Sequence, residues 1–407
     1  MQQIESNFNK ILNDLIGTAS VCLGVSGGSD STAMLYLVKQ YKDIYHNEVL
    51  VVTIDHMLRT ESKAEAAAVS RMCEKLGLNH LTIDWLHDKL PTGKIEILAR
   101  NARYDLLMNA CINNGIKYLL VAHNFDEQLE TYFIRKDMHS EERGLACMSL
   151  KRTIANDIVI IRPCLTFSKQ ELQKYLISKH VSWFEDSMNE DSKFTRIKYR
   201  KQIKLFSDEE RSQLGAKIRA FGNERRKIEI LSTKFLKTYD IVKNDGFAEL
   251  PRNEFEKLDL RVQRDVLKRL IKCVGRRMYA VSDTVCDLFI NSNNTYSHSK
   301  IVMKKNKNNI IIYYENRNIE PTMHMNAGDE MVWNNRFKIR SFINGLAVQS
   351  FGQYRRVENL PSYIAASLPE FIENDKTVHI GNQNNASLGF LCNFMTTPDL
   401  YDVFLPF

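Results

Sequence analysis

A short run of small and hydroxyl-bearing residues near the amino terminus has the composition of a phosphate-binding loop. It consists of Ser26, Gly27, Gly28, Ser29, Asp30 and Ser31. Glycines let the backbone turn tightly and approach a ligand, and the free amides at the start of a following helix favour an anion such as pyrophosphate. The run lacks the lysine of a Walker A loop. The alternative interpretation is an ordinary glycine-rich turn before a helix.

A group of carboxylates forms the second candidate site, because Asp126, Glu127 and Glu130 open a predicted helix directly after a strand. Asp126 and Glu130 are one turn apart on the same helical face. Such a group could bind a cationic amine and accept its proton during attack. Acidic residues also stabilise a first helical turn through the dipole, which is the alternative. We predict that catalysis uses these carboxylates together with Asp30 and His123.

Arginines on two further predicted helices could contact negative charge. Arg103 could pair with a carboxylate or with charge that develops on a phosphate. Arg196 and Arg200 begin a basic region that extends to Arg277 and holds 24 Lys and Arg against 12 Asp and Glu from Lys193 onward. A basic region of this kind suits RNA. Ordinary solvated surface arginines are the alternative in each case.

Alternating strands and helices must position these side chains. Apolar runs end at Gly24, near Asp55 and near Ala122, and each is followed by a helical pattern. Strands separated by helices predict parallel crossovers and a doubly wound α/β sheet, whose ligands bind beyond the carboxyl ends of the strands. Ser26, Asp55 and His123 all follow such ends, so we expect them to converge on one crevice.

The pattern of the remaining sequence predicts two further domains. We place a catalytic α/β domain at residues 1–200, a basic and mainly helical domain at 201–318, and a small β-rich domain at 319–407. We predict a linker at residues 189–200 and a β-hairpin at residues 300–314. A length of 407 residues is ample for such an arrangement.

Composition excludes several classes of protein. The sequence has no apolar run of transmembrane length and no signal-peptide pattern in its first 17 residues, so we expect a cytoplasmic protein without membrane contact. Its eight cysteines contain no C-x-x-C pair and no zinc spacing. We therefore expect reduced, mostly buried thiols and no metal held by protein ligands alone.

Together these motifs resemble the tRNA(Ile)-lysidine synthetase family of the PP-loop ATP pyrophosphatase superfamily. The resemblance is carried by residues 26–31, 55–62, 99–104, 122–131, 143–148, 162–163 and 186–200, and more loosely by residues 364–380 around Ser367-Leu368-Pro369. The order and spacing of several motifs make it specific. It covers the first half of the chain closely.

The resemblance implies an α/β PP-loop domain followed by a helical basic domain and a small β-rich C-terminal domain. It implies an enzyme that uses ATP with Mg²⁺ and free lysine to modify the wobble cytidine of tRNA(Ile) with a CAU anticodon. We expect a monomer or homodimer, between which the sequence does not decide. The family adenylates the 2-oxo group of this cytosine, and the lysine ε-amine then displaces AMP. Residues of the run 26–31 would hold ATP with Asp55 near the adenosine, Arg103, Glu127 and Glu130 would hold lysine, and Arg196 and Arg200 would face tRNA.

Several positions depart from the family pattern. Asn124 replaces a His, Glu127 replaces an Asp, and Ile197 replaces an Asn. The run Met-His-Ser-Glu at 138–141 occupies the place of Arg-Gly-Ser-Gly. This loop has lost two glycines and gained a negative charge, so it should approach a polyanion differently.

Two other functions fit parts of the pattern. A PP-loop tRNA thiolase also adenylates a base but delivers sulfur, commonly with paired cysteines. A catalytically silent RNA-binding relative would keep the fold without the reaction. Release of pyrophosphate separates an enzyme from a binder, and the transferred atom separates the two enzymes.

Overall fold

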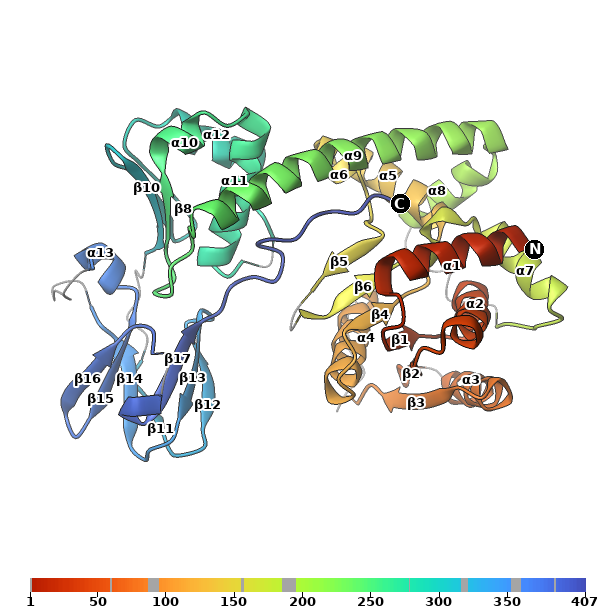
Figure 1. Cartoon of the computed structure of the whole chain (residues 1–407), viewed down its shortest axis with the longest axis horizontal. Helices are drawn as coiled ribbons and strands as arrows, with labels where there is room; N and C mark the ends of the chain where they lie inside the picture. Colours follow the sequence, from red (N-terminus) through yellow and green to blue (C-terminus); the bar gives the residue numbers. More distant parts are fainter. Residues whose placement is uncertain are drawn as a thin grey trace. The chain divides into compact units, whose positions relative to one another are not determined.

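The computed structural model describes residues 2–58, 61–86, 95–154, 157–184, 195–277, 279–315, 321–352, 360–383 and 386–407. The chain divides into two compact units, coloured by sequence in Figure 1. Unit 1 comprises residues 1–227 and 404–407, and unit 2 comprises residues 228–403. The three predicted domain boundaries stay predictions.

Unit 1 is built on a six-stranded sheet. In sheet order the strands are β3 (Asn79–Asp84), β2 (Val49–Asp55), β1 (Val21–Gly24), β4 (Tyr118–Leu120), β6 (Val159–Ile161) and β5 (Lys151–Thr153). Strand β1 pairs in parallel with β2 on one side and with β4 on the other. Only the edge strand β5 pairs antiparallel, with β6. The predicted doubly wound α/β sheet is confirmed.

Helices pack against both faces of this sheet. The described helices of unit 1 are α1 (Gln2–Ile16), α2 (Ser29–Tyr45), α3 (Ser62–Leu76), α4 (Ile95–Asn113), α5 (Phe125–Asp137), α6 (Glu142–Leu145), α7 (Lys169–Ser178) and α8 (Thr195–Lys204), with the 3₁₀ turn η2 (Pro163–Thr166). Helix α9 (Asp208–Thr238) begins in unit 1 and ends in unit 2. Along β1, Val21 and Leu23 pack into the core shared with α1, α2 and α7, whereas Cys22 packs with Leu107 and Cys111 of α4. This alternation follows from the two-residue period of a strand.

The predicted linker is helical where the structure describes it. Helix α8 occupies Thr195–Lys204, and residues 189–194 lie outside the described part. The polar composition of this segment suggested a linker. However, Tyr199 and Ile203 are buried and belong to one core cluster with α5. Two apolar residues four positions apart are therefore sufficient to dock this basic helix.

In its described residues, unit 2 combines the last part of α9 and further helices with antiparallel sheets. The further helices are α10 (Arg252–Glu256), α11 (Leu260–Val274), α12 (Asp283–Asn291) and α13 (Ser362–Ala365), with the 3₁₀ turn η4 (Ala386–Leu388). The sheets, in strand order, are β7 (Ala248–Pro251), β10 (Asn309–Tyr314), β9 (Ile301–Lys305) and β8 (Thr295–His298); β11 (Met323–Met325), β14 (Leu346–Ser350), β15 (Pro369–Glu373) and β16 (Lys376–Ile380); and β12 (Glu330–Trp333), β13 (Phe337–Ser341) and β17 (Phe390–Phe394).

The β-rich character predicted for the carboxyl-terminal part is confirmed by the last two sheets. The predicted hairpin is also confirmed as the antiparallel pair β9 and β10. Strands β7 and β8 extend it to four strands, so the region predicted as mainly helical also carries a sheet. These two strands are only four residues long, which is too short for a clear sequence pattern.

All eight cysteines are buried, which confirms their predicted burial, and none of them forms a disulfide. Among the described helices, none is both long and apolar enough to cross a membrane. Within the same described residues, no group of three or more His, Cys, Asp or Glu side chains is placed to hold a metal ion.

Candidate active site

The candidate site lies at the carboxyl edge of the central strands. Because β1 pairs with both β2 and β4, the segments that follow these three strands are neighbours. Ser26 follows β1, Asp55 ends β2, and His123 follows β4. The predicted convergence of these strand ends is confirmed. The strand order reverses between β1 and β4, which is where open α/β sheets bind ligands.

The loop after β1 is held in shape by its own serine. The Ser31 hydroxyl donates to the Gly28 carbonyl over 3.1 Å and accepts from the Ser26 amide over 3.2 Å. Gly27 has a φ of 84°, and a Cβ atom there would lie 3.0 Å from the ring of Phe184. Only glycine fits this position without strain. The Ser26 residue remains exposed, so these contacts do not close the loop.

The helix that follows this loop begins without a side-chain cap. Gly28 occupies the N-cap of α2 in an extended conformation, and this residue makes no side-chain cap hydrogen bond. Helices α5 and α7, in contrast, are each closed by a capping box. An uncapped helix start presents amide donors and a positive dipole end to a ligand. Among these three helices, α2 alone is therefore prepared for an external anion.

Asp30 lies in the first turn of α2, within electrostatic range of residues at the starts of α5 and α7. Burial raises the pKa of its carboxyl group to about 6, against an opposing effect of the Lys169 charge. The Glu127 charge raises this pKa further, and a hydrogen bond with the Asn124 side chain lowers it. Because ionised Asp30 is poorly compensated by the protein, an additional cation would stabilise it.

Glu127 has a capping function as well as a charge. Its Oε2 accepts from the Asn124 amide over 3.2 Å, and the Asn124 Oδ1 accepts from the Glu127 amide over 3.0 Å. Two departures from the family pattern thus form one reciprocal capping box. Burial lowers the pKa of Arg103, and the carboxylate of Glu127 is one of the charges that oppose this shift. Glu127 therefore lies within electrostatic range of both Asp30 and Arg103.

The other two carboxylates of α5 are ion-paired with arginines from later helices. Glu130 is 4% exposed, and its Oε1 accepts from Arg200 Nε over 2.8 Å. Asp126 Oδ1 accepts from Arg211 Nη2 over 2.6 Å, and its Oδ2 accepts from the Lys169 amide over 2.7 Å. Asp126 thus joins α5 to α7 and α9. The catalytic roles assigned to Asp126 and Glu130 stay predictions.

The carboxylate of Asp55 binds the segment that follows β2 through two hydrogen bonds. Its buried carboxylate accepts from the Met57 amide over 2.8 Å and from the Ser62 hydroxyl over 2.6 Å. The next residue, His56, packs edge-on against Trp85 with ring centroids 5.8 Å apart. A contact of Asp55 with adenosine stays a prediction, as does catalysis by the half-buried His123.

Some of the residues predicted to contact tRNA lie outside the part of the chain that the structure describes. Arg196 belongs to α8, but its side chain and residues 185–194 are outside the described residues. In the altered loop after α5, His139 has a φ of 50°, a left-handed conformation that glycine adopts more easily. This position is one of the two where the family pattern has glycine.

Sequence reasoning missed Lys169 and Arg211. Lys169 was detectable in principle, because Ser168 and Glu171 form a capping-box pattern that puts it in a first helical turn. Arg211 had no such signal. Its pairing with Asp126 joins residues 85 positions apart, which no local pattern can predict.

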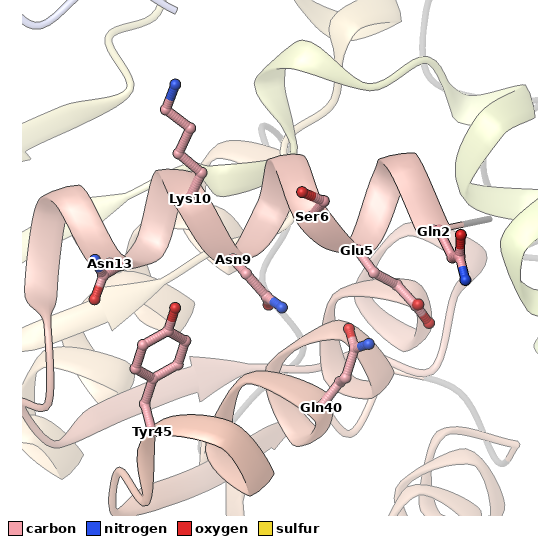
Figure 2. A pocket seen from close by; sticks show the side chains of 8 residues that line it. All are labelled: Gln2, Glu5, Ser6, Asn9, Lys10, Asn13, Gln40 and Tyr45. Atoms are coloured by element: carbon pink, nitrogen blue, oxygen red, sulfur yellow. The ribbon is translucent and has the colours of Figure 1, made fainter.

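A separate polar cavity lies between α1 and α2. It has a volume of about 530 Å³ and is lined by eight residues, including Glu5, Asn9, Gln40 and Tyr45. Figure 2 shows Glu5 and Asn9 pointing from α1 toward Gln40 of α2. Gln40 and Tyr45 belong to the end of α2, whereas the phosphate loop precedes its start. This cavity is therefore not part of the candidate site.

Comparisons with known proteins place this site in a family. Residues 1–205 match the model of the PP-loop domain. The tRNA(Ile)-lysidine synthase of Orientia tsutsugamushi (strain Boryong) is 30% identical over 340 residues, which cover 78% of this chain and 75% of that protein. The tRNA(Ile)-lysidine synthase of Wolbachia pipientis wMel is 29% identical over 376 residues, which cover 89% and 86%.

A solved structure of the U34-tRNA thiolase NcsA from Methanococcus maripaludis has a TM-score of 0.47 and 15% identity over 54% of this chain and 76% of that chain. This likeness is too distant to bear on the reaction. The matches over most of the chain and the PP-loop domain agree with the motifs read from the sequence. The chain therefore belongs to the tRNA(Ile)-lysidine synthase family of PP-loop enzymes.

Proposed function

We propose that this enzyme forms lysidine at the wobble cytidine of tRNA(Ile) with a CAU anticodon, using ATP and free lysine. The observation that supports this most directly is the uncapped start of α2, with Asp30 within electrostatic range of Glu127 of α5. It combines an anion-binding helix end with carboxylates suited to an amine, in a chain whose relatives are tRNA(Ile)-lysidine synthases.

The first half-reaction is adenylation. The cytosine O2 attacks the α-phosphorus of ATP, and pyrophosphate leaves. The amides that begin α2 would bind the phosphate oxygens, with the hydroxyl groups of Ser26 and Ser29 nearby. The charge of Lys169, which lies close enough to lower the pKa of Asp30, would add electrostatic stabilisation.

The carboxylate of Asp30 fits Mg²⁺, because this ion is typically held by one or two carboxylates together with substrate phosphates. Asp30 lacks full charge compensation in the protein, as its raised pKa indicates. When bound, Mg²⁺ would neutralise charge on the phosphates. Asp30 would orient it.

The second half-reaction replaces the adenylate with an amine. Glu127 and Glu130 would attract the ammonium group of lysine and accept a proton from it, which frees the ε-amine. This amine attacks C2 of the activated cytosine, and AMP leaves. Arg103, which is within electrostatic range of Glu127, would hold either the carboxylate of lysine or the leaving phosphate. His123 would complete the crevice, and Arg196 and Arg200 would contact tRNA.

Labelled lysine tests this function. Purified enzyme with ATP and Mg²⁺ should transfer the label to tRNA(Ile) with a CAU anticodon and not to tRNA(Met). A parallel reaction with a labelled sulfur donor should leave tRNA unlabelled, which separates this activity from that of a thiolase. Absence of lysine transfer by folded enzyme on authentic tRNA would reject the proposal.

A further inference from the structure

A buried arginine beside the candidate site has no carboxylate partner among the described residues. Arg162 directly follows β6 and is 8% exposed. Its Nη1 donates to the Ser149 carbonyl over 2.9 Å, whereas its buried Nε has no hydrogen-bond partner in the described part of the chain. Arginine side chains are rarely buried this deeply unless an anion pairs with them. The charge of Arg162 therefore needs compensation from elsewhere.

Tyr104 of α4 connects Arg162 to the surface. Burial lowers the pKa of Arg162, and the Tyr104 side chain, which shares a hydrogen bond with it, opposes this shift. The ring of Tyr104 also faces Arg100, one turn earlier on α4, whose guanidinium carbon lies 5.2 Å from the ring centroid. An aromatic ring attracts a cation at this distance. Tyr104 thus joins the buried arginine to an exposed one.

The edge strand β5 adds a third arginine. In the antiparallel pair of β5 and β6, Arg152 lies opposite Ile160. The charges of Arg152 and Arg100 lower the pKa of Arg162 further, so the three guanidinium groups lie within electrostatic range of one another. Arg100 and Arg152 are exposed, and neither forms an ion pair with another described residue. We call Arg100, Arg152 and Arg162 the arginine patch.

The arginine patch adjoins the candidate site. Because β6 pairs in parallel with β4, Arg162 lies at the same edge of the sheet as His123. On α4, Arg103 precedes Tyr104 and lies within electrostatic range of Glu127. All these residues belong to unit 1. The patch therefore flanks the crevice in which the nucleotide is modified under the proposed function.

The ligand of this patch should be an anion. Three like charges without carboxylate partners repel one another, and an external anion relieves this repulsion. Arg100 and Arg152 are exposed on two different elements, which suits a phosphate of an extended chain better than a small ligand enclosed in the crevice. Arginine also matches the geometry of phosphate through paired hydrogen bonds.

We propose that the arginine patch binds a backbone phosphate of tRNA next to the modified nucleotide. Arg100 and Arg152 contact this phosphate, and Arg162 is a positioning residue that holds Arg100 in place through Tyr104. This inference rests on the proposed function, which makes tRNA the substrate. The carboxylate of free lysine is the other anion of the reaction, and the experiment separates the two.

Binding of tRNA(Ile) at several salt concentrations tests the patch. The slope of the logarithm of the association constant against the logarithm of the salt concentration reports how many phosphates the protein neutralises. In Arg100→Gln and in Arg152→Gln we expect weaker binding and a slope smaller in magnitude by about 0.7 to 1. The KM for lysine should stay unchanged in both variants.

An arginine elsewhere in unit 1 provides the matched control. Arg71 is exposed on α3, so Arg71→Gln removes the same charge outside the patch and should leave the slope unchanged. A raised KM for lysine with an unchanged slope in Arg100→Gln would overturn the proposal and assign the patch to the lysine carboxylate. An unchanged slope together with an unchanged KM would overturn it as well.

The variant Tyr104→Phe tests the positioning role of Arg162. It removes the hydroxyl group that bonds to Arg162 but keeps the ring that faces Arg100, and it avoids replacing the buried arginine itself. We expect a smaller salt slope with an unchanged KM for lysine. Lower stability in urea with the salt slope of the unmodified enzyme would show that Arg162 has only a structural role.

Pyrophosphate release from ATP with tRNA(Ile) is followed in parallel. Its absence in the unmodified enzyme would refute the proposed function itself. Its presence, with an unchanged salt slope in Arg100→Gln and Arg152→Gln, would refute only the arginine patch.

Discussion

At the scale of single residues, the site is defined by how each charge is compensated. Asp126 and Glu130 have arginine partners, whereas Asp30 has a pKa raised to about 6 by burial. An acid whose pKa is raised in the folded state weakens the fold when it ionises. Asp30 is therefore a residue that reduces stability in the free enzyme and is suited to a cationic ligand.

Replacing Asp30 with Asn should stabilise the free enzyme and abolish pyrophosphate release. The folded pKa is about 6 and the ordinary value is 3.8. Ionised Asp30 therefore lowers the free energy of unfolding. This loss grows as the pH rises from about 4 to 6 and stays constant above pH 6, where it amounts to at most about 3 kcal/mol. Urea unfolding at pH 7 and at pH 3.5 measures it, and the gain should disappear at the lower pH. Asp43→Asn, on the exposed part of the same helix, is the control and should change stability little.

At the scale of elements, the helices around the site differ in whether their first amides are capped. Helix α2 is uncapped and open to a ligand, whereas α5 is closed by its own Asn124 and Glu127. In α5 a single side chain thus has two separable properties, a hydrogen bond to the N-cap amide and a negative charge toward the site. A capping box accepts Gln as well as Glu at this position, so the two properties can be tested apart.

The variant Glu127→Gln should keep the stability of α5 and lose lysine transfer. The amide oxygen can still accept from the Asn124 amide, but the charge that would attract ammonium is removed. We expect a change in unfolding free energy within about 0.5 kcal/mol and a rise in the KM for lysine of at least tenfold. Asn124→Ala is the opposite control, because it should cost about 1 kcal/mol of stability. Equal loss of stability in both variants would contradict this separation.

At the scale of the whole molecule, the chain leaves unit 1 after residue 227 and returns to it at residue 404. The last residues pack within unit 1: the Leu150 amide donates to the Leu405 carbonyl over 2.9 Å, and Phe407, 9% exposed, lies 6.0 Å from Phe125 of α5 between ring centroids. Residues far apart in the sequence thus share one core, and the helix with the carboxylates packs in it.

Removing the Phe407 ring should therefore destabilise unit 1. For Phe407→Ala we expect a loss of about 3 kcal/mol, at the lower end of the range for buried Phe to Ala substitutions. Amide hydrogen exchange in α5 and β5 should accelerate accordingly. Leu205→Ala, which truncates a side chain that is 85% exposed, should leave exchange in both elements unchanged. Equal effects of the two variants would show that the returning segment adds no stability.

Local sequence patterns were enough to predict most of the elements of unit 1. The phosphate loop, the order of strands and helices in unit 1 and the polar residues at strand ends were all predicted, because turn residues and side-chain periodicity act over a few positions. The segment around α8 was misread as a linker, since Tyr199 and Ile203 are outnumbered there by basic residues. The Asn124 and Glu127 capping box was also missed, although its pattern is local.

The charge state of the site was decided by tertiary structure. The sequence shows three carboxylates on one helix and many arginines further on, but not which pairs form. Arg200 reaches Glu130 and Arg211 reaches Asp126 across 70 and 85 positions, whereas burial raises the pKa of Asp30 to about 6 despite the opposing charge of Lys169. Ion pairing depends on distance and burial, which are set by how the helices pack and not by the order of residues along the chain.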